Sequence, residues 1–94
     1  MKKSILQQEK CCYICGTTRD LHRHHVLYGS ANRRLSEEDG LTVYLCQRHH
    51  TGMAGVHFNK KIDLTLKAKA EKAYIETYNK TIEDFIKRYG KNYL

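Results

Sequence analysis

The chain has 94 residues, and its 17 Lys or Arg against 10 Asp or Glu give a formal net charge of +7. This length leaves room for a single domain, and a hydrophobic content of 40% excludes a disordered polycation. We expect one domain over 1–94, with an N-terminal segment at 1–10, a core at 11–60 and an amphipathic helical tail at 61–94. The positive charge predicts an acidic polymer as partner.

The N-terminal segment does not resemble an export signal, because its apolar stretch is only Ile5-Leu6. No apolar run approaches the roughly 18 residues that a membrane helix needs. We therefore expect a cytoplasmic protein with no membrane partner, in a compartment where thiols stay reduced and disulfides are disfavoured.

Two short segments rich in β-branched and aromatic residues, 21–28 and 41–45, are bounded by Gly29 and Gly40 and predict two strands. The polar loop between them contains Ser36, which we expect to cap a single helical turn over 36–39. A hairpin with such a loop predicts an α+β fold.

The lysine-rich tail has the spacing of an amphipathic helix, which we predict over 64–78 with Asp63 as N-cap. A turn at 79–80 is followed by a capping-box pattern that starts a short last helix, and Gly90 is its expected end. One apolar face is predicted for the whole tail, formed by Tyr74, Tyr78, Ile82, Ile86 and Tyr89.

Four cysteines and six histidines are unusually dense for this length. Cys12 and Cys15 form a C-x2-C pair, and Cys46 and His49 form a C-x2-H pair, so that two turns supply the four tetrahedral N/S ligands that zinc prefers. We predict a structural Zn²⁺ that staples the N-terminal loop to the end of the second strand. Cys11 is the alternative to Cys12, although its distance from Cys15 is one residue longer than usual.

The order of these motifs resembles the HNH endonucleases (the ββα-metal or His-Me finger nucleases), in particular their small zinc-containing phage members. The resemblance covers about Cys12 to Lys60, and is carried by the two ligand pairs, by 21–26 with its His24-His25, and by 55–60 with its His57. It implies a zinc-stapled ββα-metal finger, a two-stranded hairpin plus helix, followed by a C-terminal helical extension.

The resemblance also implies residue roles. His25 corresponds to the general base and His24 to a ligand of a catalytic divalent cation, either Mg²⁺, Mn²⁺ or another transition metal. Either His50 or His57 supplies a further ligand. The family's middle asparagine is absent at Gly40-Leu41, and Asn32 and Asn59 are the nearest substitutes.

Phosphodiester hydrolysis needs a base near neutral pH, a cation and a positive group that holds the backbone, and this chain offers all three residue types. We assign nucleic-acid contacts to Arg33, Arg34, Asn32, Asn59 and Lys60. Adjacent strand residues point to opposite faces, so His24 and His25 can act on one phosphate only where the strand ends or bulges.

The leading function is therefore a metal-dependent DNA endonuclease with His25 as general base and little sequence specificity. The alternatives are an inactive zinc-stabilised nucleic-acid-binding module and a zinc-organised protein-interaction domain, against which the charge of +7 weighs. The resemblance to phage members implies a bacterial or phage-infected host cell and packaging or recombination proteins as partners.

Overall fold

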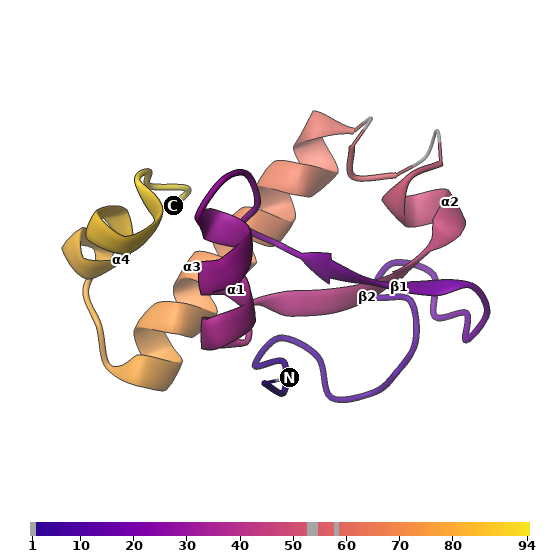
Figure 1. Ribbon diagram of the computed structural model, residues 1–94, viewed down its shortest axis with the longest axis horizontal. Coiled ribbons are helices and arrows are strands. Elements are labelled where there is room, and N and C mark those ends of the chain that lie inside the picture. The colour runs from indigo at the N-terminus through magenta and orange to yellow at the C-terminus, as the bar shows by residue number, and fades with distance from the viewer. Residues whose placement is uncertain (1, 53–54, 58) are drawn as a thin grey trace.

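The computed structural model describes residues 2–52, 55–57 and 59–94 as a small α+β fold built on a two-stranded antiparallel hairpin (Figure 1). The elements in chain order are β1 (Leu21–His25), α1 (Asn32–Asp39), β2 (Thr42–Cys46), α2 (Gln47–His50), α3 (Lys60–Tyr78) and α4 (Ile82–Tyr89). The strands pair from Leu21 opposite Cys46 to His25 opposite Thr42. In the described part of the chain, no helix has the length and apolar character needed to cross a membrane.

The two predicted strands are confirmed, but β1 is shorter than 21–28. It ends at His25, and the next two residues turn away from the sheet and become fully buried. The hydroxyl of Ser36 fixes this departure, because it accepts from Leu27 N (3.1 Å) and donates to Leu27 O (2.6 Å). The end of β1 leaves His25 at the rim of the hairpin.

The prediction that Ser36 caps a single turn is wrong. A two-turn helix, α1, begins at Asn32 and carries Ser36 in its interior. Ser36 is fully buried and its hydroxyl bonds to Leu27, so it is not available to cap a helix. The helix ends at Gly40, whose φ of 73° lies in the left-handed region that glycine adopts without strain.

The predicted tail helix is confirmed, but it starts one turn earlier than 64. The side chain of Asn59 accepts from Ile62 N (3.1 Å) and caps α3, while Asp63 forms an ion pair with Lys67 (2.9 Å) instead. The predicted capping box before α4 is present, with Thr81 and Asp84 as its two members. Gly90 ends α4, as predicted.

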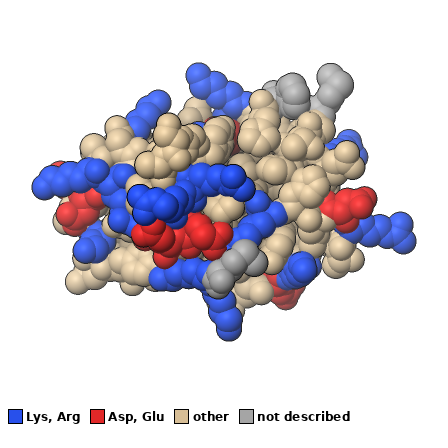
Figure 2. Space-filling view, in the orientation of Figure 1, with Lys and Arg blue, Asp and Glu red and all other residues tan. Residues whose placement is uncertain are grey.

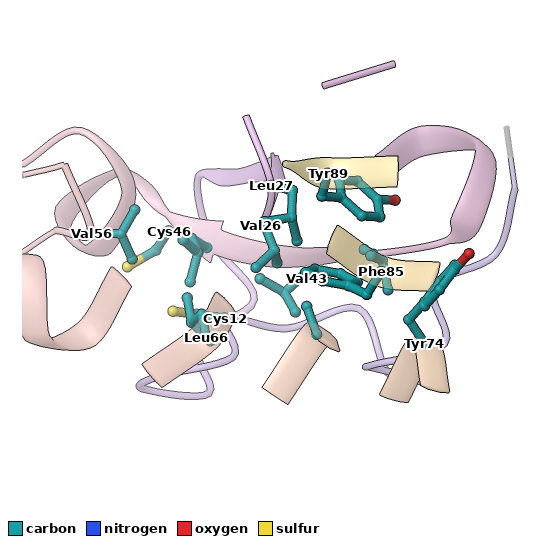
Figure 3. Packing of buried hydrophobic residues seen from close by; sticks show 13 residues of the cluster. Cys12, Val26, Leu27, Val43, Cys46, Val56, Leu66, Tyr74, Phe85 and Tyr89 are labelled. Carbon is teal, nitrogen blue, oxygen red and sulfur yellow. The ribbon is translucent and has the colours of Figure 1, made fainter. Parts of the chain in front are cut away.

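The predicted apolar face does not continue through the tail. Tyr74 and Tyr89 are buried, but Ile82 and Ile86 are 39% and 38% exposed, and Phe85 is fully buried in their place. The chain turns at Asn79 (φ 54°), so α4 is a new helix whose inward face is set by its own packing and not by the register of α3. Phe85 packs against Tyr89 and Tyr74 in a core that continues to Cys12 and Cys46 (Figure 3).

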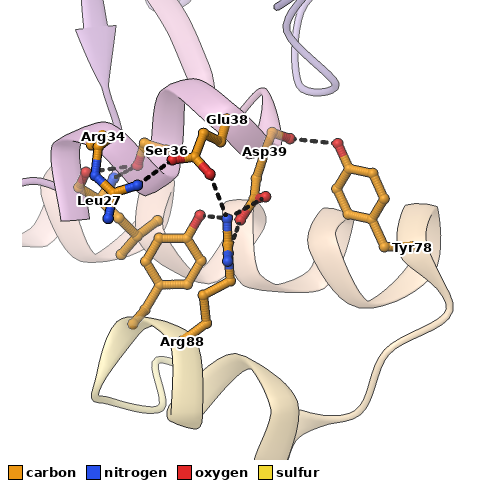
Figure 4. A network of polar contacts seen from close by, with 8 residues as sticks. Leu27, Arg34, Ser36, Glu38, Asp39, Tyr78 and Arg88 are labelled. Carbon is orange, nitrogen blue, oxygen red and sulfur yellow. Dashed lines mark hydrogen bonds and ion pairs between the residues drawn. The ribbon is translucent and has the colours of Figure 1, made fainter. Parts of the chain in front are cut away.

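The C-terminal helix is joined to α1 by a polar network around Asp39 (Figure 4). The Asp39 carboxylate accepts from Arg88 Nε (2.6 Å) and Tyr89 Oη (2.5 Å), and its backbone oxygen accepts from Tyr78 Oη (2.7 Å). The N-terminal segment is tied to the other side of the hairpin, where Ile5 N donates to Gly40 O and Tyr44 N donates to Gln7 Oε1. Both ends of the chain thus hold the hairpin in place.

Candidate metal centres

The predicted Cys3His set is assembled, and it is positioned to bind a metal ion. The ligand atoms of Cys12, Cys15, Cys46 and His49 all lie within 4.8 Å of one another. Cys15 Sγ is 3.8 Å from Cys46 Sγ, and His49 Nδ1 is 3.3 Å from Cys46 Sγ. Zn–S bonds of about 2.3 Å in a tetrahedron place two sulfur atoms about 3.8 Å apart. The spacing therefore fits a four-coordinate structural metal.

Backbone hydrogen bonds shape this cluster. Gly16 N donates to Cys12 O (2.8 Å) to close the first turn, and Tyr13 N donates to Tyr44 O (2.8 Å), which fixes the turn to β2. Burial acts to raise the pKa of the Cys12 thiol, but backbone N–H groups, first that of Cys15 and then that of Cys46, outweigh it and lower the pKa to about 6. Cys12 is thus a thiolate near neutral pH, the form that binds metals.

The alternative ligand Cys11 lies outside the cluster. Its sulfur atom faces Gln7 Nε2 at 3.8 Å, and its backbone oxygen accepts from the same amide. The structure therefore selects Cys12 from the two adjacent cysteines.

A second group of potential ligands is formed by His24, His50 and His57, whose nitrogen atoms also lie within 4.8 Å of one another. His24 is 3% exposed, and its Nε2 has no hydrogen-bond partner among the described residues. Burial, followed by the nearby His50 and His57, lowers the pKa of His24 to about 3, so its ring is neutral and able to bind a metal at neutral pH. The sequence left His50 and His57 as alternatives, and the structure brings both to His24.

His25 lies beside this second group but makes different contacts. Its Nε2 is 2.9 Å from Glu37 Oε1, and Arg23 also bonds Glu37, with Nη2 2.9 Å from Oε2. Arg23, and then His25, lowers the pKa of the Glu37 carboxyl to about 2. The carboxylate is therefore ionised and can only accept hydrogen bonds, so His25 Nε2 carries a proton; in a neutral imidazole the acceptor nitrogen is then Nδ1.

Sequence reasoning missed Glu37. Arg23 and His25 alternate with His24 along β1 and share one side of the strand, which signals that a carboxylate should face them. Three consecutive acidic residues, Glu37 to Asp39, follow Ser36 in the chain. Only the rotation of α1 decides which of them reaches β1, and that rotation depends on its tertiary packing.

A hollow of about 250 Å³ lies where the histidine group meets the end of β1. Both His24 and His25 line it, together with Arg23, Tyr28, Arg33, His50 and His57. Adjacent strand residues share this space because β1 stops at His25. Three histidines, a carboxylate-bound histidine and two arginines thus face one volume.

The residues predicted to contact nucleic acid are divided. Arg33 lines the hollow, and Arg34 lines the neighbouring depression while paired with Glu38 (2.6 Å). Asn32 Nδ2 donates to Tyr89 O (3.1 Å), and Asn59 caps α3, where exposed Lys60 is the first residue. Lys and Arg predominate among the charged side chains on the face in Figure 2. Only the two arginines are therefore placed beside the histidines by these contacts.

No protein-family model, curated protein or solved structure gave a significant match to this chain. The geometry of the two ligand groups and of the hollow beside them is therefore the basis for the proposed function.

Proposed function

We propose that the protein is a metal-dependent DNA endonuclease of the HNH type, in which β1, β2 and α2 form a ββα-metal finger. The single observation that carries the proposal is the hollow that His24, His50 and His57 share with His25 and Arg33. A metal-ligand set, a base with a free nitrogen and a cation that can hold a phosphate are the groups that phosphodiester hydrolysis requires.

The Cys3His cluster has the structural role in this proposal. Four protein ligands leave no coordination position for water or substrate. Zn²⁺ is the proposed ion, because a tetrahedral set of three thiolates and one imidazole is typical of structural zinc sites.

The histidine group is the proposed catalytic metal site. Three imidazole ligands leave at least one position open for a phosphate oxygen or water, and a divalent ion held there would stabilise the charge that develops on the phosphate. Imidazole nitrogen suits transition metals, whereas Mg²⁺ prefers oxygen ligands. Among the cations considered, the ligand set therefore favours a transition metal over Mg²⁺.

His25 is the proposed general base. Glu37 holds the protonated Nε2, which leaves Nδ1 to accept a proton from the attacking water, and the resulting imidazolium is stabilised by the same carboxylate. Arg33 lines the same hollow and forms no ion pair with the described residues, and it is the proposed phosphate contact. The net charge of +7 supplies sequence-independent attraction to DNA.

The test is nicking of supercoiled plasmid by wild type and by His25→Ala over Mg²⁺, Mn²⁺, Ni²⁺ and Zn²⁺, after circular dichroism and zinc analysis show that both proteins are folded. Lys72→Ala, an exposed substitution on α3, is the matched surface control. Metal-dependent nicking by wild type and the control that is lost in His25→Ala supports the proposal.

Equal nicking by wild type and His25→Ala would overturn the assignment of the base. Absence of nicking by wild type, with salt-sensitive DNA binding retained, would overturn the nuclease and favour the inactive zinc-stabilised nucleic-acid-binding module.

A further inference from the structure

His22 is the histidine that the proposed function does not use. It lies two residues before His24 on β1, so the two rings project from the same face of the strand. His22 is half-buried, and its Nδ1 is 2.9 Å from Nδ1 of His50. The rings meet edge to face, with centroids 5.1 Å apart. His22 itself is outside the group of three potential ligands.

The contact between the two Nδ1 atoms restricts both rings. A neutral imidazole has one N–H donor and one acceptor nitrogen, so one of these two Nδ1 atoms must donate and the other must accept. The contact occupies Nδ1 of His50, which leaves Nε2 as the ring nitrogen free to bind a metal. A metal-binding Nε2 has no proton, so the proton of neutral His50 is on Nδ1 and is donated to His22.

We infer that His22 is a positioning residue, which holds His50 in the tautomer and orientation that present Nε2 to a metal ion shared with His24 and His57. The inference rests on the proposed metal site, but it does not depend on nuclease activity.

Metal-binding histidines usually donate their second ring N–H to a carboxylate, a backbone carbonyl or water. Among the described residues, His22 is the only hydrogen-bond partner recorded for the His50 ring. His22 therefore fills the place that a carboxylate or carbonyl fills in other sites. Its own proton is then on Nε2.

The position of His22 in the hairpin makes this contact a link between β1 and α2. His22 pairs with Leu45, and the next residue of β2, Cys46, precedes α2 and belongs to the Cys3His cluster. The hairpin register and the Cys3His cluster thus fix the backbones of β1 and α2 relative to one another, and the His22–His50 bond sets the orientation of the His50 ring.

The experiment measures binding of a second equivalent of Zn²⁺ by calorimetry, with the first equivalent already bound, for wild type, His22→Ala, His22→Asn and His22→Asp. His22→Ala should bind the second equivalent about 10- to 100-fold more weakly, the usual cost of losing such a partner. Asn and Asp place an acceptor oxygen near the former Nδ1, so both should restore binding towards that of wild type. Lys72→Ala, an exposed substitution on α3 away from the histidines, is the matched control and should bind normally.

A second measurement reads the tautomers directly. Long-range ¹H–¹⁵N NMR spectra of the fully Zn²⁺-loaded wild type should show His50 bound through Nε2 with a proton on Nδ1, and His22 protonated on Nε2. If His22→Ala binds the second equivalent of Zn²⁺ as tightly as wild type, His22 does not position His50. If His22→Asn and His22→Asp unfold at the same temperature as wild type but do not restore Zn²⁺ binding, an acceptor at this position is not what the site requires. Either result, or His50 bound through Nδ1, overturns the inference.

The failures are distinguishable. If wild type takes up no second equivalent of Zn²⁺, the metal site is wrong and the inference falls with it. If binding depends on His22 as expected but wild type does not nick DNA, only the proposed nuclease function falls.

Discussion

The two ligand groups meet at one point of the chain, where His49 is followed by His50, but they differ in composition and surroundings. Cys46 and His49 belong to the first group, and His50, the next residue, belongs to the second. The first group has four potential ligands and the second has three, so only the second leaves a coordination position open. One short helix, α2, thus contributes His49 to a group that a tetrahedral ion would fill and His50 to a group that would leave a position open.

The surroundings reinforce this contrast. Cys12 and Cys46 are 2% and 7% exposed and belong to the hydrophobic core, whereas His57 is exposed at the edge of the hollow. Changes in the first group should therefore affect folding, and changes in the second should affect metal binding and catalysis while the core remains packed.

The largest expected effect is that of Cys46→Ser. Structural zinc contributes an apparent 10–16 kcal/mol of binding free energy in small zinc-dependent domains, as much as the roughly 5–15 kcal/mol by which a domain is stable. We expect Cys46→Ser to lose most of its cooperative thermal unfolding transition, followed by circular dichroism. Cys11→Ser, which changes the cysteine outside the cluster, is the control and should unfold like wild type. A cooperative transition of wild-type stability in Cys46→Ser would contradict the structural role of the cluster.

The second effect should separate the two groups. His50→Ala should keep its first equivalent of Zn²⁺ and its cooperative unfolding, because the Cys3His cluster is intact. It should lose the second equivalent and all metal-dependent nicking of plasmid, because His24 and His57 alone hold the ion too weakly. Loss of both equivalents would show that the two centres are one folding unit, which removes the distinction between them.

Glu37→Gln tests the proposed general base, His25, beside the second group. A general base contributes about 10²- to 10⁴-fold to the rate. Glu37→Gln keeps His25 but loses the carboxylate, so we expect kcat to fall by part of this factor with little change in KM. The pKa of Glu37 is lowered from an ordinary 4.5 to about 2. The contribution of the ionised carboxylate to the free energy of unfolding is therefore complete above about pH 4.5 and declines as the pH falls towards 2. The rate difference attributable to Glu37 ionisation should therefore be constant across neutral pH. An unchanged kcat in Glu37→Gln would contradict the proposed role.

The contrast between the centres also explains what the sequence could predict. Each half of the Cys3His cluster is a local pattern, C-x2-C or C-x2-H, that a single turn brings together, so the sequence predicts the four residues that the structure positions to bind a metal ion and leaves only Cys11 as an alternative to Cys12. The histidine group depends on contacts between β1, α2 and the segment before α3. The spacing of its members therefore could not decide between His50 and His57.

The two wrong predictions for the helices, the Ser36 cap and the continuous apolar face of the tail, also arise where distant contacts decide the structure. Ser36 has the sequence pattern of an N-cap, but burial against Leu27 places it inside α1. Phe85 lies outside the predicted apolar face because the turn at Asn79 resets the helical register. In both places tertiary packing overrides a local preference.

A smaller effect is expected where a substitution weakens the fold without touching either centre. Tyr89→Phe removes the hydroxyl that donates to the Asp39 carboxylate, a charge-assisted bond, and should cost about 1–2 kcal/mol of unfolding free energy. Tyr78→Phe removes a bond to the neutral backbone oxygen of Asp39, so its cost should be smaller. Urea denaturation of the two variants and wild type measures both. A larger loss in Tyr78→Phe would show that the Asp39 carboxylate does not anchor α4.

The smallest effect concerns the proposed binding of DNA beside the second group. Arg33 lines the hollow, whereas Arg34 is 70% exposed at its side chain and paired with Glu38. If Arg33 contacts a phosphate, Arg33→Ala should reduce the slope of log K against log salt by about 1, measured by fluorescence anisotropy with a labelled duplex. Arg34→Ala, the matched control from the same turn of α1, should reduce the slope less, because its guanidinium is already partly neutralised. Equal slopes for the two variants would mean that the charge of the whole surface, and not the position of Arg33 beside the histidines, guides DNA to the site.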